Sequence, residues 1–253
     1  MLSKSKIKLI TSLSQKKFRD EAGLFVAEGT KLVMDLAPDF RCRMLVATPQ
    51  WLGEHGMVPC EDLEETSEAD IRRVSNQKTP QGVLALFQKP DYSWDADVLE
   101  NKLSLALDGV QDPGNLGTVI RVADWFGIGD IFCSGNSADA FGPKTVQATM
   151  GALARVRVHT VDLAGFLGGC KDRTPVYGTF MDGESIYSKK LSASGIIVMG
   201  NEGNGISPGI EKLVGHRVLV PNFPQGQPTS ESLNVGVATA LVCAEFRRRE
   251  IIG

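Results

Sequence analysis

The sequence predicts an α/β protein in two parts: a small N-terminal unit and a larger C-terminal unit built on a mostly parallel sheet. From about residue 100, short apolar runs alternate with helical patterns, as in a chain of strands and crossover helices. These runs are apolar throughout, which is typical of parallel strands covered by helices on both faces. The stretch 91–102, DYSWDADVLENK, has no clear periodicity. We therefore assign residues 1–95 to a first domain and residues 100–253 to a second.

The first domain is expected to be a short mixture of helices and strands, with Pro38 and Pro90 closing two of its elements. Its expected helices cover residues 6–23, 30–38 and 68–77, and its expected strands cover residues 24–29, 41–49 and 82–90.

The second domain alternates more regularly. Its expected strands cover residues 103–109, 130–135, 155–160, 175–180, 195–200 and 216–221. Its expected helices cover residues 114–127, 142–153, 162–170 and 207–214, followed by a last helix that ends on three arginines. Ligands of such sheets bind outside the carboxyl ends of the strands. Three loops there are rich in glycine and polar residues, over residues 108–121, 200–207 and 221–234.

Composition excludes several classes of protein. No apolar run approaches the ~20 residues that cross a membrane, and the start lacks a signal-peptide core and cleavage site. The five cysteines are scattered without a C-x-x-C pair, and the three histidines have no metal-like spacing. We expect a cytoplasmic protein with no membrane segment and no metal.

Charge is unevenly distributed on a chain whose net charge is −3. Residues 4–19 are basic, residues 54–70 are acidic, and Arg247, Arg248 and Arg249 form a basic end. A basic arm on an acidic protein fits a nucleic acid held at one face. A solvated helix surface explains the same charges.

Common catalytic motifs are missing. The chain has no P-loop and no G-x-S-x-G elbow, and GNGISP lacks the third glycine of a dinucleotide fingerprint. No cysteine has an obvious histidine partner. What remains is a ligand held by the backbone of glycine-rich loops, although Gly200, Gly203 and Gly205 also fit a plain strand-to-helix turn.

Three polar residues in these loops have two interpretations each. Asn115 stands at a helix start and can cap it. Arg121 lies in a mostly apolar helix, where it either extends to the surface or binds an anion. Glu202 follows a strand and can favour the dipole of the next helix.

Taken together, the three loops resemble a known family. DPGNLGTVIRVADWFG, VMGNEGNGIS and VPNFPQGQPTSESLNVGVATAL are similar to the three motifs of the SpoU (TrmH-type) RNA ribose 2′-O-methyltransferases, within the SPOUT superfamily. The shared patterns are N-x-G-x-x-x-R, G-x-E-x-x-G-x-S and S-L-N-V, and the resemblance runs from about residue 103 to the C-terminus. LFVAEGTKLVMD, more loosely, resembles the ribosomal-protein-like substrate-binding domain found upstream in many members.

The resemblance implies a C-terminal domain with a deep trefoil knot, an exception to the rule that chains avoid knots. It implies that S-adenosylmethionine (SAM) lies against the knotted loops and that the protein is a homodimer acting on RNA, either rRNA or tRNA. The cofactor-binding positions it implies are Gly200, Val220, Leu233 and Thr179. The catalytic positions it implies are Arg121, Asn115, Glu202, Ser232 and Asn234. The third loop, NFPQGQPTSE, is longer and richer in proline than the family's usual link.

The mechanism follows as a hypothesis. Guanidinium stays protonated, so we expect Arg121 to bind the adjacent phosphate and stabilise alkoxide charge. Asn115 and Asn234 are expected to orient the hydroxyl and Arg121, and Glu202 to order its loop or hold Arg121. Thr229 or Ser230 is expected to cap the last helix, whose broad apolar face suits a dimer contact. Two alternatives stay open: a non-catalytic RNA-binding protein of the same fold, and a methyltransferase acting on a base or a small molecule.

Overall fold

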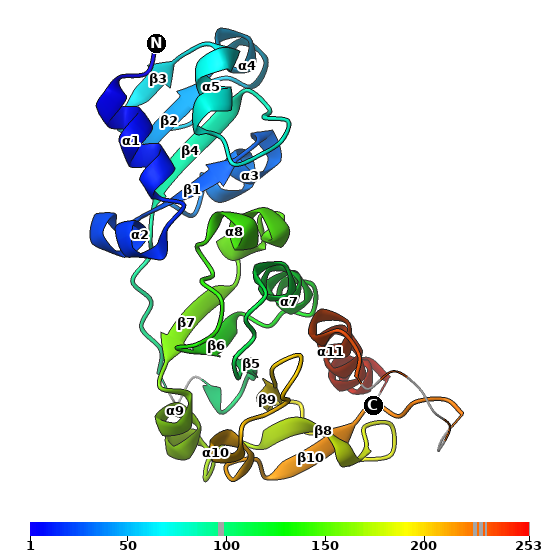
Figure 1. The fold of residues 1–253 in the computed structure, drawn as a ribbon. Helices are drawn as coiled ribbons and strands as arrows, with labels where there is room; N and C mark the ends of the chain where they lie inside the picture. Colours follow the sequence, from blue (N-terminus) through cyan, green and yellow to red (C-terminus); the bar gives the residue numbers. More distant parts are fainter. Residues whose placement is uncertain (96–98, 225–226, 228–229, 231, 253) are drawn as a thin grey trace. The chain divides into compact units, whose positions relative to one another are not determined.

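The computed structural model describes every residue except 96–98, 225–226, 228–229, 231 and 253. The chain divides into two compact units, each described separately below (Figure 1). Unit 1 comprises Met1–Asp91 together with Asp139–Ala154, and unit 2 comprises Tyr92–Ala138 together with Arg155–Gly253. A segment from the middle of the sequence thus folds with the N-terminal unit. No helix among the described residues is long and apolar enough to cross a membrane.

Unit 1 contains a four-stranded sheet with the order β1-β4-β2-β3. β4 is antiparallel to β1 and to β2, whereas β3 is parallel to β2. The strands are β1 (Leu24–Glu28), β2 (Cys42–Ala47), β3 (Leu63–Glu65) and β4 (Val83–Gln88). The helices are α1 (Lys4–Ser12), α2 (Lys16–Ala22), α3 (Thr30–Leu36), α4 (Pro49–His55), α5 (Glu68–Val74) and α8 (Pro143–Thr149). Ile10 of α1 and Ile71 of α5 pack with Val46 and Leu84 in one buried cluster.

The continuous helix predicted over residues 6–23 is wrong. α1 ends at Ser12 and α2 starts at Lys16, because Leu13 turns into the core and Gln15 has an extended backbone. The break positions buried Arg19, whose guanidinium donates to the Leu13 carbonyl at 2.7 Å and to Asp139 at 2.6 Å. Asp139 begins the segment that joins unit 1 from the middle of the sequence, so this ion pair fastens that segment.

Unit 2 contains a six-stranded sheet in which every strand pair is parallel, as predicted. Its order is β10-β8-β9-β5-β6-β7. The strands are β5 (Leu103–Leu107), β6 (Asp130–Ser134), β7 (Arg157–Val161), β8 (Val176–Ser185), β9 (Gly195–Met199) and β10 (His216–Leu219). The helices are α7 (Pro113–Trp125), α9 (Leu163–Cys170), α10 (Pro208–Glu211) and α11 (Val235–Ile252).

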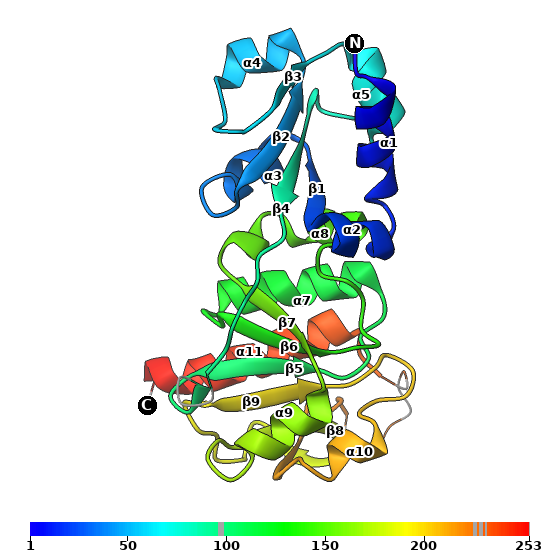
Figure 2. The same ribbon diagram turned by 90° about the vertical axis from the view of Figure 1, so that its left-hand side faces the viewer.

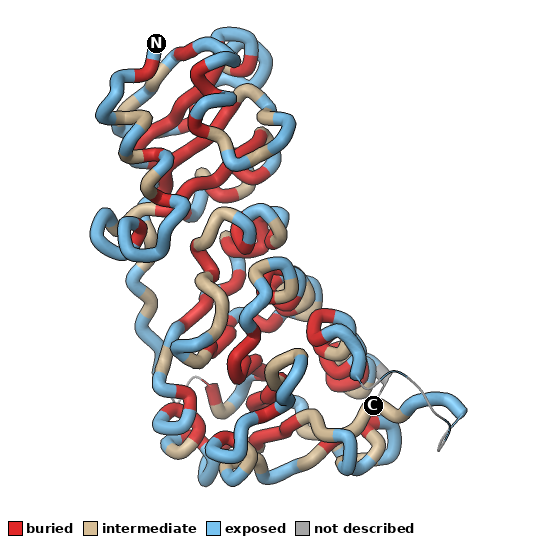
Figure 3. Tube along the Cα trace, in the orientation of Figure 1, coloured by how far each residue is buried: buried red, intermediate tan, exposed pale blue. Residues whose placement is uncertain are grey.

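Helices cover both faces of this sheet (Figure 2). α9 and α10 pack on one face, where Phe166 and Ile210 join Ala106 and Val198 in a buried cluster. α7 and α11 lie side by side on the other face. The central strands are buried along their length (Figure 3). Since all strands are parallel, their carboxyl ends meet at one edge, where the three candidate loops begin.

Some further element boundaries, in both units, differ from the sequence predictions. The helix predicted over residues 142–153 ends at Thr149, because Met150 takes a left-handed conformation with φ of 52°. α10 is only four residues long. β8 extends to Ser185, and its pairing with β10 jumps from Gly178 to Glu184, so residues 179–183 bulge out of the ladder.

Candidate active site

A chain of side-chain hydrogen bonds joins the three glycine-rich loops at the carboxyl edge of the unit 2 sheet. The Asn234 amide donates to Oδ1 of Asn115 at 2.9 Å. The Asn115 amide in turn donates to Oε1 of Glu202 at 2.9 Å. Asn115 follows β5, Glu202 follows β9, and Asn234 follows β10. The structure therefore brings together three of the five predicted catalytic residues.

Asn115 is available for this role because another residue caps α7. The Asp112 carboxylate accepts from the backbone N–H of Asn115 at 2.8 Å, and Pro113 occupies the first helical turn. Asn115 itself lies two residues into the helix, with its side chain directed to the neighbouring loop. The alternative that Asn115 serves as the helix cap is wrong.

Glu202 is positioned by a tightly closed loop. Asn201 and Gly205 exchange two backbone hydrogen bonds of 2.9 Å. The Asn201 side chain accepts from the backbone of Gly203 at 2.9 Å and donates to the Gly109 carbonyl at 2.7 Å. A Cβ at Gly200 would lie 2.2 Å from the carbonyl carbon of Gly205, so only glycine fits there. The glycines thus form a turn, and that turn presents Glu202 to Asn115.

Asn234 also starts the last helix. Its Oδ1 accepts from the backbone N–H of Gly236 at 2.9 Å and of Val237 at 3.3 Å, which is the action of an N-cap. α11 begins at Val235, so the prediction that Ser230 or Thr229 caps it is wrong for Ser230. Thr229 lies outside the described residues. Asn234 therefore bonds Asn115 through its amide nitrogen and caps α11 through its amide oxygen.

Arg121 does not join this network. It lies six residues beyond Asn115, which places it on another face of α7, in an exposed row with Thr118 and Trp125. Within the described part of the chain, no hydrogen bond or ion pair involves Arg121. Glu202 bonds to Asn115 instead, so the prediction that Glu202 holds Arg121 is wrong in this structure.

Ser232 and the four predicted cofactor-binding residues lie along the same edge. Ser232 is exposed, and no hydrogen bond to its side chain is seen among the described residues. Gly200 follows β9, Thr179 lies in β8, and Val220 follows β10. β8 lies between the other two strands. Leu233 is 48% exposed just before α11.

This set fits a ligand such as SAM by its donor chemistry. Three of the four positions carry no polar side-chain atom and offer only backbone N–H and C=O groups, which can hydrogen-bond an adenine edge. Apolar Val220 and Leu233 flank these groups. Thr179 fits less well, because its hydroxyl faces the Met199 sulfur at 4.0 Å.

Two positioning residues escaped the sequence analysis. Asn201 closes the Glu202 loop, as described above. Asp108 is buried at the end of β5, and its carboxylate accepts from the backbone N–H of Ser207 at 2.7 Å. An asparagine at a glycine-rich turn and an aspartate directly after an apolar strand are recognisable patterns. Their partners, about 90 residues away along the chain, could not be predicted.

The three terminal arginines bind the protein itself. Arg247 donates to the Phe126 carbonyl at the end of α7 at 2.8 Å. Arg249 donates to the Ile186 carbonyl at 3.0 Å. Arg248 and Arg249 both bond Glu245, each at 2.8 Å. These contacts favour the structural interpretation of the basic end over an RNA contact.

Buried thiols offer no nucleophile. Burial raises the pKa of Cys133 and of Cys243 to about 12, so both stay protonated at neutral pH. All five cysteines are free. No group of three or more potential metal ligands occurs among the residues described.

Comparison with known proteins gives the geometry a family context. Residues 102–244 match the model of the SpoU rRNA methylase family. Residues 4–85 match the model of an MRM3-like substrate-binding domain. Each of the two matches falls on one of the two parts expected from the sequence.

Individual relatives cover nearly the whole chain. The 23S rRNA (guanosine(2553)-2′-O)-methyltransferase RlmP of Bacillus subtilis is 30% identical over 96% of both proteins. Among solved structures, a TrmH-family protein of Porphyromonas gingivalis is 42% identical with a TM-score of 0.90, covering 98% of this chain and 99% of that one. An AdoMet-bound rRNA methyltransferase of Sinorhizobium meliloti is 31% identical with a TM-score of 0.84, covering 98% and 97%.

Proposed function

The chain belongs to the SpoU rRNA methylase family, and from this premise we propose that its substrate is ribosomal RNA and its target a guanosine ribose. It is a SAM-dependent RNA 2′-O-methyltransferase of α/β fold. The relative from Bacillus subtilis, similar along its whole length, carries both the rRNA and the guanosine in its name. Residues 4–85 match a substrate-binding domain. This match supports a large RNA as the substrate, because a small one would not need a separate binding domain.

The hydrogen-bond chain Asn234–Asn115–Glu202 is the observation that carries the assignment of the site. It ties the three family motifs together in one place, at the sheet edge where ligands of such folds bind. We assign Asn115 and Asn234 to orienting the ribose hydroxyl and Glu202 to fixing Asn115. Backbone of Gly200, Val220 and Leu233 would hold SAM, which supplies a methyl group already activated on sulfonium.

We assign Arg121 to binding the RNA substrate. A guanidinium cannot act as a base at neutral pH, but it can bind a phosphate and stabilise negative charge on the attacking oxygen. Its exposure and the lack of an ion pair within the described residues support this role. Ser232, exposed beside Asn234, is a further candidate for contact with the substrate.

The exposed side of α7 and α11 supports a homodimer. Trp125 is 85% exposed on α7, and Val237 and Leu241 are 51% and 39% exposed on the adjacent α11. Exposed apolar side chains on two adjacent helices are typical of an interaction surface, and a second copy of the chain is the simplest partner. Arg121 lies in the same row as Trp125, so dimer contact would bring the arginine close to the second protomer.

The path of the chain between β10 and α11 bears on the proposed trefoil knot. The strand order places β10 beyond β8, so the chain must return past the ends of β8 and β9 for α11 to reach α7. This path supports the trefoil knot.

We also propose that the protein is cytoplasmic. Its five free cysteines and the bacterial relative named above support this location.

Transfer of labelled methyl from SAM tests the function directly. Purified protein is incubated with rRNA and, separately, with tRNA, and the RNA is hydrolysed to nucleosides. We expect label on the 2′-oxygen of guanosine from rRNA. Label on tRNA alone would overturn the rRNA assignment, and label on a base would overturn ribose chemistry. No SAM binding by calorimetry, together with no transfer to any RNA, would favour the non-catalytic alternative.

A further inference from the structure

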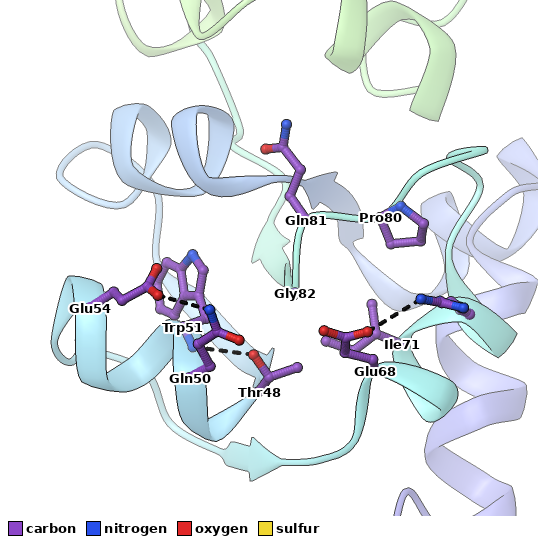
Figure 4. Close-up of a pocket in the computed structure, with 10 residues that line it drawn as sticks. Thr48, Gln50, Trp51, Glu54, Glu68, Ile71, Pro80, Gln81 and Gly82 are labelled. Atoms are coloured by element: carbon purple, nitrogen blue, oxygen red, sulfur yellow. Dashed lines mark hydrogen bonds and ion pairs between the residues drawn. The ribbon is translucent and has the colours of Figure 1, made fainter.

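Unit 1 contains a pocket of about 170 Å³ between α4, α5 and the loop that leads into β4 (Figure 4). Ile71 forms an apolar part of its lining, and the ring of Pro80 flanks one side. Polar side chains surround these groups: Gln50 and Glu54 from α4, and Glu68 and Arg72 from α5. The lining is therefore mainly polar, with a small apolar part.

The loop on one side of the pocket is held rigidly. Glu28, buried at the end of β1, accepts from the backbone of Asn76 at 3.0 Å and from its side-chain amide at 2.9 Å, and also accepts from the Ser75 hydroxyl. Further along, Gln81 accepts from the backbone N–H of Thr30 at 3.2 Å. A charged acceptor with several donors orders a loop strongly, so the pocket is formed before any ligand arrives.

Two carboxylates contribute hydrogen-bond acceptors to the rim. Gln50 donates to Oε1 of Glu54 at 2.9 Å, and Arg72 donates to Oε2 of Glu68 at 3.2 Å. Each carboxylate keeps its other oxygen without a hydrogen bond from the described residues. Each carboxylate oxygen has two lone pairs, so one carboxylate can still accept from two adjacent N–H donors of a flat ring, and the ring of Pro80 offers an apolar surface beside them.

The volume of the pocket limits which ligands fit. A volume of about 170 Å³ has room for one planar ring system. Among RNA bases, guanine presents N1–H and N2–H together on its Watson–Crick edge, whereas adenine and cytosine offer only their amino groups and uracil only N3–H. Carboxylate oxygens accept well from such paired donors. Proteins usually read RNA through unpaired bases of this kind.

We propose that this pocket binds one unpaired guanine of the RNA substrate, at a position separate from the methylated nucleotide. The inference rests on the proposed function, since it takes RNA as the ligand of unit 1. The pocket would recognise a base other than that of the methylated nucleotide.

Binding of short RNAs to the full-length protein without SAM tests the proposal. The probes are three fluorescein-labelled heptanucleotides: seven uridines, and the same strand with guanosine or adenosine at its centre. We expect the guanosine strand to bind at least tenfold more tightly than the other two. The double variant Glu54→Gln/Glu68→Gln should reduce this preference to about twofold or less. Glu65→Gln, an exposed change of the same chemistry on β3, should keep it.

A photocrosslink gives a second readout. The central guanosine is replaced by 6-thioguanosine, which keeps the N1 and N2 hydrogens, and crosslinked peptides are identified by mass spectrometry. Crosslinks within residues 44–72 or 79–89 support the pocket. Crosslinks confined to unit 2, or equal affinity for all three strands, would overturn it. Methyl transfer to rRNA is assayed in parallel. Normal transfer without a preference for guanosine would contradict only the guanine pocket. A preference for guanosine without methyl transfer would contradict only the proposed activity.

Discussion

The side-chain amide of Asn234 donates a 2.9 Å hydrogen bond to Asn115, across 119 residues of sequence. The same asparagine caps α11 through its oxygen. Because the two amide atoms have different partners, the rotamer of Asn234 is fixed from both sides. The start of the last helix and the geometry of the site are therefore determined by one side chain.

Two substitutions of Asn234 should separate these effects. Asn234→Ala removes the cap and the bond to Asn115, so we expect a loss of about 1 kcal/mol of stability and a large loss of methyl transfer. Asn234→Asp keeps a capping oxygen but cannot donate to Asn115. It should unfold like the wild type in urea while transfer falls at least tenfold. Equal activity of the aspartate variant and the wild type would show that the bond to Asn115 is dispensable.

Gly200 is expected to be irreplaceable for packing reasons. A Cβ there would lie 2.2 Å from the Gly205 backbone, so Gly200→Ala must displace the turn that carries Glu202, at roughly 1–3 kcal/mol. We expect SAM affinity, measured by calorimetry, to weaken at least tenfold. Gly203→Ala is the matched control, because its Cβ would meet only the Asn201 side chain at 3.6 Å. Similar affinities for the two variants would contradict the expectation.

Local sequence patterns predicted most of the fold. Uniformly apolar strands such as β5 and β9 indicated a parallel sheet buried on both faces. α4 and β3 were missed, because Pro49 was taken as the end of a strand and β3 is three residues, two of them glutamate. The association of residues 139–154 with unit 1 was also missed. It involves long-range contacts such as the Arg19–Asp139 pair and the packing of Phe141 on Phe25, which no local pattern reveals.

The candidate site was predictable in its location but not in its pairings. Parallel strands bring their carboxyl ends together, so the sequence could place Asn115, Glu202 and Asn234 at one edge. Which side chains meet there depends on helix phase and rotamers. Asn115, two residues into α7, reaches Glu202, whereas Arg121 lies on another face of the same helix.

Acid should weaken the clamp at the end of α11. Glu245 is 5% exposed, and its bonds to Arg248 and Arg249 hold its pKa at about 2, below the ordinary value of 4.5. A depressed carboxyl pKa stabilises the fold fully above the unfolded value, and this contribution is lost as pH falls from about 4.5 to about 2. Glu245→Gln should therefore destabilise the protein at pH 7 and progressively less below pH 4.5. Urea titrations at pH 7, 4 and 3 measure this, with exposed Glu65→Gln as control.

A charge on the exposed side of α7 should disrupt the proposed dimer. Trp125→Glu places a carboxylate where an 85% exposed indole stands in the single chain, and burying an unpaired charge in a contact is costly. We expect light scattering to give the mass of a dimer for the wild type and of a monomer for the variant. Met181→Glu changes a 71% exposed methionine on β8 and should stay dimeric. A wild-type protein that stays monomeric at all concentrations would contradict the proposed dimer.

Arg121 gives the sharpest test of the chemistry, because it has no structural partner to lose among the described residues. Its removal should leave stability and SAM affinity unchanged. Losing one preorganised charge at a reacting oxygen typically lowers the rate by two to three orders of magnitude, so single-turnover transfer by Arg121→Ala should fall at least 100-fold. Arg121→Lys keeps the charge without the planar guanidinium group. Its transfer rate should lie between those of the wild type and Arg121→Ala. Arg173→Ala, which breaks an ion pair with Glu100 in the same unit, is the control and should keep full activity. Unchanged transfer by Arg121→Ala would show that this arginine has no part in the reaction.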